Sequence, residues 1–306
     1  HALGWISETD ETRHLAEFGV VFLMFSIGLE FSLPKLVTMK HIVFAFGSSQ
    51  VAITILLVMV VTWMMGMDWR TGLALGGALA MSSTAIVIKM LADRLELNSL
   101  HGRQIIGVLL FQDLAVIPLL IIIPALATTV DNDTADYGVM FATAIFKALV
   151  VLTLILFLGQ KMMRPWFHLV ARQKSSELFV LNVLLITLGL AWLTEMAGLS
   201  LALGAFLAGM LISETEYRYQ VEDDIKPFRD ILLGLFFVTI GMLLDIQVVI
   251  QDFLWVIVLL LAFIAIKLIL IAGLSRLFGA SARVAVRTGI NLAQSGEFGF
   301  VLMALA

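Results

Sequence analysis

The chain has 306 residues, of which 61% are hydrophobic and 14% charged, and its mean hydropathy is +1.04. Soluble domains are about 45 to 50% apolar and about 25% charged, so this composition is that of an integral membrane protein. The absence of cysteine excludes a disulfide framework and thiolate chemistry, and a net charge of −4 is too small to indicate a nucleic-acid partner.

Apolar segments follow one another along the whole chain, and we count about ten of them with a window of about 20 residues per span. We expect spans at residues 14–31, 41–66, 71–92, 104–128, 139–160, 177–197, 199–213, 226–244, 253–275 and 285–306. The connections are short and no run alternates as a barrel strand does, so the sequence predicts one all-α membrane domain over residues 1–306. Because the chain begins at His1 and stops inside an apolar run at Ala306, we expect a fragment that lacks spans at both ends.

The basic residues predict the orientation of these spans. If the first span starts outside, fourteen Lys and Arg fall in inside loops, against Arg13 and Arg70 in outside loops. The inside set is Lys35, Lys40, Arg94, Arg103, Lys161, Arg164, Arg172, Lys174, Arg218, Lys226, Arg229, Arg276, Arg283 and Arg287. We therefore expect the start of the chain outside the cell. The segment from Arg164 to Lys174 fits either an amphipathic piece at the cytoplasmic interface or a plain loop.

Two of the predicted spans carry polar interruptions at bilayer depth. In the third span, Ser82, Ser83 and Thr84 place three hydroxyls in succession, which can satisfy freed backbone groups or bind a hard cation. The tenth span has a second interruption, made of Asn291, Gln294, Ser295, Gly296, Glu297 and Gly299. Two interrupted spans in corresponding halves predict an inverted-repeat transporter whose ion site lies where the broken helices cross. Close helix packing through small residues is the alternative interpretation.

Asp113 is the only ionisable side chain between Arg103 and Asp131, in an apolar stretch long enough to cross a bilayer. A carboxylate near the middle of a spanning helix costs about 2.5 to 3.5 kcal/mol on insertion scales, so its presence indicates a functional role. Gln112 adds amide donors and a carbonyl acceptor at the same depth. A buried group that holds one proton or one cation is the minimum part of an ion-coupled carrier. The sequence therefore predicts an ion site at Gln112 and Asp113.

Lys267 is a further charge placed deep in a predicted span. It lies about 14 residues after Phe253, which is about 21 Å along a helix and too far for easy escape to the surface. We expect a partner inside the bundle, with Asp113 as the first candidate and Glu297 as the second. A cation that arrives at Asp113 would have to displace the ammonium, so such a pair has the chemistry of cation-for-proton exchange. A static bridge that only joins two helices is the alternative.

Five stretches of the chain resemble the second monovalent cation:proton antiporter family. They are Phe111–Pro118, Ser82–Ala85, Gly204–Gly209, Leu235–Met242 with Asp245, and Gln294–Phe298. The glutamine before Asp113 resembles the Kef-type, glutathione-regulated potassium:proton exchangers, whereas electrogenic sodium exchangers of the family usually carry two acidic residues there. The resemblance implies a sodium/proton-antiporter-like fold with inverted repeats and two crossing broken helices.

The resemblance also implies roles for single residues. The ion-binding carboxylate of the family corresponds to Asp113 and the preceding amide to Gln112. The hydroxyls of the unwound helix correspond to Ser83 and Thr84, and the core lysine corresponds to Lys267.

Other implications concern what lies around the transport site. The acidic stretch Glu222, Asp223 and Asp224 resembles a cytoplasmic loop that contacts a nucleotide-binding regulatory domain in Kef-type proteins. Family members have about thirteen spans, so the fragment would lack two spans at its start, one at its end and any such domain. Regulation by nucleotide or glutathione, a homodimer and placement in the cell inner membrane are implied by the resemblance alone.

The sequence thus predicts a secondary transporter, not an enzyme, that exchanges potassium for protons by alternating access. A core bundle bearing Ser82–Thr84, Gln112–Asp113, Lys267 and Gly296–Glu297 would move against the remaining spans. One carboxylate beside a neutral amide predicts electroneutral exchange. The alternatives are a sodium/proton antiporter of the same fold, a gated cation channel, for which no selectivity-filter loop is evident, and a membrane sensor without transport. We expect no cofactor besides the transported ion, and membrane lipid as the surroundings.

Overall fold

The computed structural model describes residues 10–30, 38–127, 137–173, 175–242 and 246–304. Within these ranges the secondary structure is helical and contains no strand, which confirms the predicted all-α class. Several residues used in the sequence argument lie outside the described ranges: His1, Lys35, Asp131, Lys174, Asp245 and Ala306. The helices form two compact units, His1–Ser32 with Leu120–Ile246 (unit 1) and Leu33–Leu119 with Gln247–Ala306 (unit 2).

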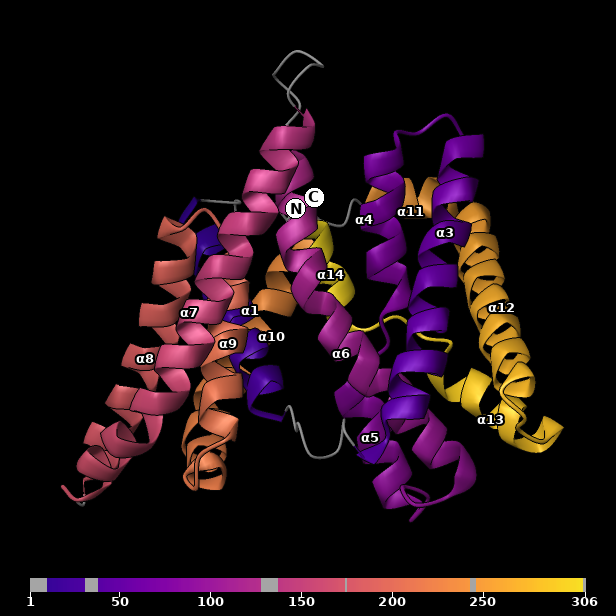
Figure 1. Ribbon diagram of the computed structural model, residues 1–306. Coiled ribbons are helices and arrows are strands. Elements are labelled where there is room, and N and C mark those ends of the chain that lie inside the picture. Colours follow the sequence, from indigo (N-terminus) through magenta and orange to yellow (C-terminus); the bar gives the residue numbers. More distant parts are fainter. Residues whose placement is uncertain (1–9, 31–37, 128–136, 174, 243–245, 305–306) are drawn as a thin grey trace. The chain divides into compact units, whose positions relative to one another are not determined.

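Unit 1 is built around a short apolar helix. It contains α1 (Asp10–Glu30), α7 (Tyr137–Ala171), α8 (Ser176–Met196), α9 (Leu201–Ser213) and α10 (Arg218–Met242). Nearly all of α9 is buried, because α1, α7 and α8 pack against it, and α1 also packs against α10 (Figure 1). Ser200 begins α9 by accepting a hydrogen bond from the backbone N–H of Leu203, which resolves the boundary with the preceding helix.

Glycine allows α1 and α9 to approach each other closely. A Cβ added at Gly209 would lie 2.0 Å from the carbonyl oxygen of Phe25, and one added at Gly28 would lie 2.1 Å from that of Phe206. Contacts of this kind are a common way for membrane helices to associate, because small residues bring the backbones together. The Gly204–Gly209 motif of the sequence therefore has a packing role in unit 1.

We expect Gly209→Ala to destabilise the protein by about 2 kcal/mol, because a methyl group cannot be placed against the α1 backbone without moving one helix. Gly189→Ala in α8 is the matched control, since a Cβ at Gly189 meets no atom within 4 Å. Denaturant unfolding in mixed micelles would measure both variants. Equal stability of the two variants would contradict the close contact.

Two segments of unit 1 correct the sequence expectations. Glu222, Asp223 and Asp224 lie in the first turns of α10 and not in a loop. The helix forms there because Val221 and Ile225, four residues apart, are both buried on one face, and it continues through Pro227. Likewise, α7 runs on through Pro165 to Ala171, so the part of the basic segment up to Ala171 is helical and is not a plain loop.

Unit 2 contains the two interrupted segments. The first is α4 (Trp69–Ala80) followed by α5 (Thr84–Asp93), and the second is α13 (Ala282–Leu292) followed by α14 (Glu297–Ala304). Around them lie the π-helical turn η1 (Ile42–Gly47), α3 (Ser48–Met64), α6 (Leu100–Ala127), α11 (Ile246–Gln251) and α12 (Phe253–Leu277). Residues of α6 from Leu120 onward are grouped with unit 1.

Unit 2 is held together by packed helix pairs and by one apolar core. α3 packs against α4, α12 packs against α13, and α14 packs against α4. A buried cluster joins η1, α5, α6, α12 and α13 through Phe46, Val87, Leu91, Ile105, Val108, Leu109, Ile271, Leu274 and Leu292. This core fixes α6 beside both interrupted segments, and α6 is the helix that carries Asp113.

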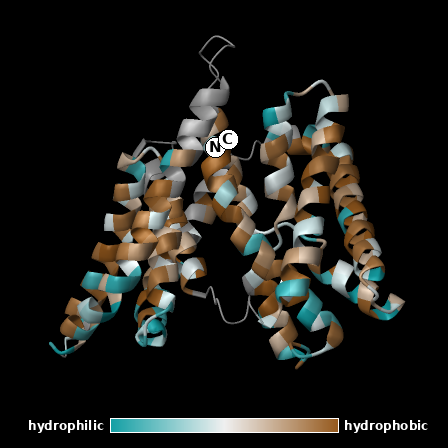
Figure 2. Cartoon of the chain, viewed as in Figure 1, coloured by the Kyte–Doolittle hydropathy of each residue, from teal (hydrophilic) through white to brown (hydrophobic). Residues whose placement is uncertain are grey.

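Length and composition make five helical segments of the described chain candidates to cross a membrane. They are Ile42–Met64, Leu100–Leu126, Val150–Ala171, Glu177–Met196 and Phe253–Leu277. Four of them coincide with expected spans, whereas Val150–Ala171 overlaps the expected span 139–160 only at residues 150–160. The interrupted segments are too short to qualify because each is split in two. Figure 2 shows hydrophobic colours along the long helices of each unit and hydrophilic colours at helix ends and turns.

Candidate cation-binding site

The first interruption of unit 2 is a three-residue stretch of non-helical backbone between α4 and α5. Helix α4 ends at Ala80, and Met81 and Ser83 both have extended dihedral angles, with ψ of 148° and 110°. The Ser83 hydroxyl accepts a hydrogen bond of 3.4 Å from the backbone N–H of Ile86 and so begins α5. The Ser83 hydroxyl thus satisfies a backbone group freed by the break, as the sequence predicted.

The second interruption meets the first. Helix α13 ends at Leu292 and α14 begins at Glu297, with a short non-helical segment between them in the yellow part of Figure 1. The Ser82 hydroxyl donates to the carbonyl of Leu292 at 2.9 Å, and a Cβ at Gly296 would lie 2.6 Å from the carbonyl carbon of Ser82. Only glycine permits this approach of two backbones. The prediction of two broken helices that come together is therefore confirmed.

Asp113 and Gln112 of α6 face the first interruption. Gln112 is fully buried and Asp113 is 7% exposed. The Thr84 hydroxyl donates to Oδ1 of Asp113 at 3.0 Å, and the backbone N–H of Ser82 donates to Oε1 of Gln112 at 2.8 Å. A carboxylate oxygen and a hydroxyl oxygen thus lie together at a helix break, which is the kind of oxygen set that binds hard cations.

Gln50 of α3 belongs to the same network, although nothing in the sequence argument selected it. Its Oε1 accepts a hydrogen bond of 2.7 Å from Nε2 of Gln112. Its own Nε2 donates at 3.2 Å to the carbonyl of Ala80 and at 3.2 Å to the hydroxyl of Thr54. The available signal was the single amide side chain of the expected span 41–66, but its partners lie 62 and 30 residues away in sequence.

Lys267 joins the two interruptions. Its ammonium donates to the carbonyl of Met81 at 2.8 Å and to the carbonyl of Gln294 at 2.8 Å, and the side chain is 2% exposed. The ammonium thus has one backbone carbonyl partner from each interruption, and its pairing with Asp113 or Glu297 stays a prediction.

The remaining predicted residues lie in or next to the second interruption. Gln294 accepts from the backbone N–H of Ser83 at 3.1 Å, and its Nε2 is buried without a hydrogen-bond partner among the described residues. The hydroxyl of Ser295 donates to the carbonyl of Ala78 at 3.4 Å. Glu297 is half-buried at the first position of α14. The Thr84 hydroxyl is thus bonded to Asp113, while the hydroxyls of Ser82 and Ser83 have backbone partners.

The structure brings most of the predicted site residues together in unit 2. Those joined by the contacts above are Ser82, Ser83, Thr84, Gln112, Asp113, Lys267, Gln294, Ser295 and Gly296. The acidic residues Glu222, Asp223 and Asp224 lie in α10 of unit 1 and are not part of this set. Among the residues the structure describes, no group of three or more His, Cys, Asp or Glu side chains is arranged to hold a metal ion.

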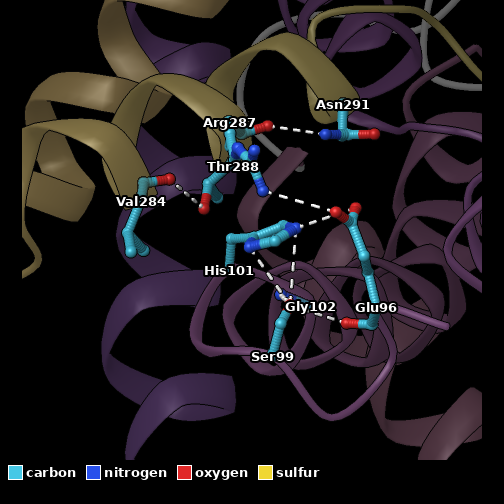
Figure 3. A network of polar contacts seen from close by, with 8 residues as sticks. All are labelled: Glu96, Ser99, His101, Gly102, Val284, Arg287, Thr288 and Asn291. Atoms are coloured by element: carbon cyan, nitrogen blue, oxygen red, sulfur yellow. Dashed lines mark hydrogen bonds and ion pairs between the residues drawn. The ribbon is translucent and has the colours of Figure 1, made fainter. Parts of the chain in front are cut away.

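A polar cluster fixes the turn between α5 and α6 to α13 (Figure 3). Glu96 accepts from Arg287 of α13 at 3.3 Å, and its other oxygen lies 3.1 Å from Nε2 of His101. The Ser99 hydroxyl lies 3.1 Å from Nδ1 of His101 and accepts from the backbone N–H of Gly102 at 3.0 Å. One carboxylate therefore links the start of α6 to the helix that leads into the second interruption.

The pH dependence of stability provides a test of this cluster. The hydrogen bond from His101, helped by the nearby charges of His101, Arg287 and Arg94, holds the pKa of the Glu96 carboxyl below its ordinary value of 4.5, against an opposing effect of burial. A lowered carboxyl pKa stabilises the folded state above pH 4.5, and this stabilisation is lost as the pH falls further. We expect Glu96→Gln to lower the thermal midpoint at neutral pH, with the difference from wild type vanishing under strong acid. A difference independent of pH would contradict the assignment.

Comparison with known proteins places the chain in a family. Residues 1–306 match the family described as "Sodium/hydrogen exchanger, transmembrane". A protein of Alkalimonas amylolytica described as "Putative K(+) efflux antiporter KefB" is 42% identical over 306 residues, which are 100% of this chain and 46% of that protein. K(+) efflux antiporters 2 and 1 of Arabidopsis thaliana, both chloroplastic, are 43% identical over 305 residues, covering 98% of this chain and 26% of each relative.

The chain thus spans about half the length of the bacterial relative and about a quarter of the plant relatives. The match to the exchanger family covers every residue, including both interrupted segments and Asp113. The comparison confirms the predicted family and the multi-pass membrane fold. The chain therefore belongs to the transmembrane sodium/hydrogen exchanger family.

Proposed function

We propose that the protein is a secondary transporter that exchanges a monovalent cation, potassium in the first place, for protons at Asp113. The observation that carries the proposal is the buried Asp113 carboxylate bonded to Thr84 where two interrupted helices meet. A carboxylate in this position holds either one proton or one cation, because burial makes the neutral form and the cation-bound form the favourable ones. The relatives described as K(+) efflux antiporters support potassium, and sodium is the alternative.

The neighbouring amide sets the proposed stoichiometry. Gln112 carries no charge, and its oxygen and one of its N–H groups are already bonded to Ser82 and Gln50. The site therefore offers one negative charge, on Asp113, to either substrate. One proton for one cation is an electroneutral exchange, and the net charge of the site is the same in both loaded states.

Alternating access would carry this site from one side of the membrane to the other. All residues of the proposed site belong to unit 2, which would be the moving core bundle, and unit 1 would supply the scaffold within one transport domain. Lys267 would either compete with the cation for Asp113 or remain a bridge between the interruptions. The greater length of the relatives supports additional segments, which would include a nucleotide-binding regulatory domain. A homodimer, the cell inner membrane and an outside start of the chain complete the proposal.

Exchange measured in proteoliposomes at imposed membrane voltage tests the proposal. Potassium uptake should drive proton release from the same vesicles, and the steady-state rate should not change with voltage. Strongly voltage-dependent exchange would contradict electroneutral coupling. Potassium flux without proton movement would instead identify a gated channel, and sodium flux in place of potassium would identify the sodium/proton alternative.

A further inference from the structure

We propose that Gln50 is a positioning residue of the cation site, which fixes the orientation of the Gln112 amide and holds it on the backbone of the first interruption. This inference rests on the proposed function, since it concerns how the site meets its cation. Gln50 lies on α3 and bonds to Gln112, the residue that precedes Asp113 on α6. It has no role in the family resemblance described above.

The two glutamines close a ring of hydrogen bonds with the interrupted helix. The ring runs from the Ala80 carbonyl to Nε2 of Gln50, from Oε1 of Gln50 to Nε2 of Gln112, and from Oε1 of Gln112 to the N–H of Ser82. Each link has a defined donor and acceptor, so turning either amide by half a rotation would set donor against donor or acceptor against acceptor. The orientation of Gln112 is thus determined from both sides.

Burial makes this orientation costly to lose. Gln50, Gln112, Ala80 and Ser82 are each 0% exposed, so water is not at hand to replace a missing partner. The Ala80 carbonyl has lost its helical partner because α4 stops there, and Gln50 supplies a new one. Gln50 therefore supports the interruption directly and, through Gln112, also holds the Ser82 backbone.

The chemical consequence concerns which oxygens meet the cation. With its oxygen held by Ser82, Gln112 cannot turn that oxygen toward an ion at Asp113, which lies next to it on α6. Thr84 follows Ser82 by two residues, so the position of its hydroxyl on Asp113 depends on the same backbone. Gln50 acts on the cation only through these groups, and its loss should alter the apparent affinity for the ion before it alters the maximal rate.

Potassium-dependent proton exchange by the whole protein in proteoliposomes provides the test, with the apparent KM and the maximal rate measured separately. Gln50→Met keeps the size of the side chain and removes the amide, and we expect the apparent KM for potassium to rise about tenfold, the effect of one buried hydrogen bond. Ser49→Ala is the matched control, because the Ser49 hydroxyl bonds only to the Ala45 carbonyl of the preceding helical turn. Its KM should stay that of wild type.

The combination with Gln112→Met separates positioning from general packing. If Gln50 acts through Gln112, the double variant has the KM of Gln112→Met alone, whereas independent structural effects would multiply. An unchanged KM in Gln50→Met, or multiplied effects in the double variant, would overturn the inference. Gln50→Asn, which withdraws the amide by one methylene, is judged by the same criteria if the Met variant does not fold. Absence of exchange in the wild type would contradict the proposed function itself, a result distinct from these.

Discussion

Replacing Asp113 by asparagine is expected to abolish cation-coupled proton exchange completely while the protein still folds. Asparagine keeps the shape of the side chain and an oxygen that can accept from the Thr84 hydroxyl, but it can neither bind a proton nor neutralise a cation. The measurement is proton movement on addition of potassium, sodium or lithium to proteoliposomes. Purified Asp113→Asn should likewise release no proton when these salts are added.

Asp93→Asn is the matched control for this experiment. Asp93 is the last residue of α5 and is exposed, so the same chemical change there should leave exchange intact. Size-exclusion chromatography of both variants would verify that they fold alike. Coupled exchange that persists in a well-folded Asp113→Asn protein would refute the assignment of the ion site.

Replacing Lys267 by methionine is expected to destabilise the protein by about 3 kcal/mol, because the carbonyls of Met81 and Gln294 would both lose a charged donor. Hydrogen bonds to charged groups are worth about 1.5 to 3 kcal/mol each, and relief of a buried charge offsets part of the loss. The free energy of unfolding in mixed micelles is the quantity to measure.

Two further variants test the cause of that loss of stability: Lys267→Gln as a partial rescue and Lys161→Met as a control. Glutamine retains two N–H donors without charge, so it should recover part of the stability if the bridge between carbonyls is what matters. Lys161 is exposed on α7, and its replacement should have little effect. A Lys267→Met protein as stable as wild type would show that the bridge contributes nothing.

Sequence reasoning located the helices and their interruptions because both have local causes. Long apolar runs predict membrane helices from their length alone, and the hydroxyls of Ser82–Thr84 and the flexibility of Gly296 mark helix breaks. The expected span 226–244 begins later than α10, which starts at Arg218 and includes Glu222–Asp224. The helix extends to these acidic residues because Val221 and Ile225 are buried on one face.

The sequence predicted which polar side chains form the site, but not which backbone groups and distant residues they contact. Asp113 stood out because its charge is isolated in the sequence, and its bond to Thr84 agrees with the proposed roles of both residues. The contacts of Lys267 were not predictable, because its acceptors are backbone carbonyls freed by a helix break. Every residue has such a carbonyl, so the amino-acid type does not identify the ones that are free. Gln50 escaped notice for a related reason: its importance comes from the Ala80 carbonyl and from Gln112, two partners distant in sequence.

The backbone groups of the first interruption are already hydrogen-bonded to side chains, and this has a consequence for the hydration of the ion. The carbonyls of Ala80 and Met81 and the N–H groups of Ser82 and Ser83 are all engaged by side chains. A cation that arrives at Asp113 therefore finds few carbonyl oxygens to replace the water molecules it leaves behind. If the proposed exchange takes place at Asp113, such a site would discriminate by the energy of dehydration and would favour the larger alkali cation, which holds its water less tightly.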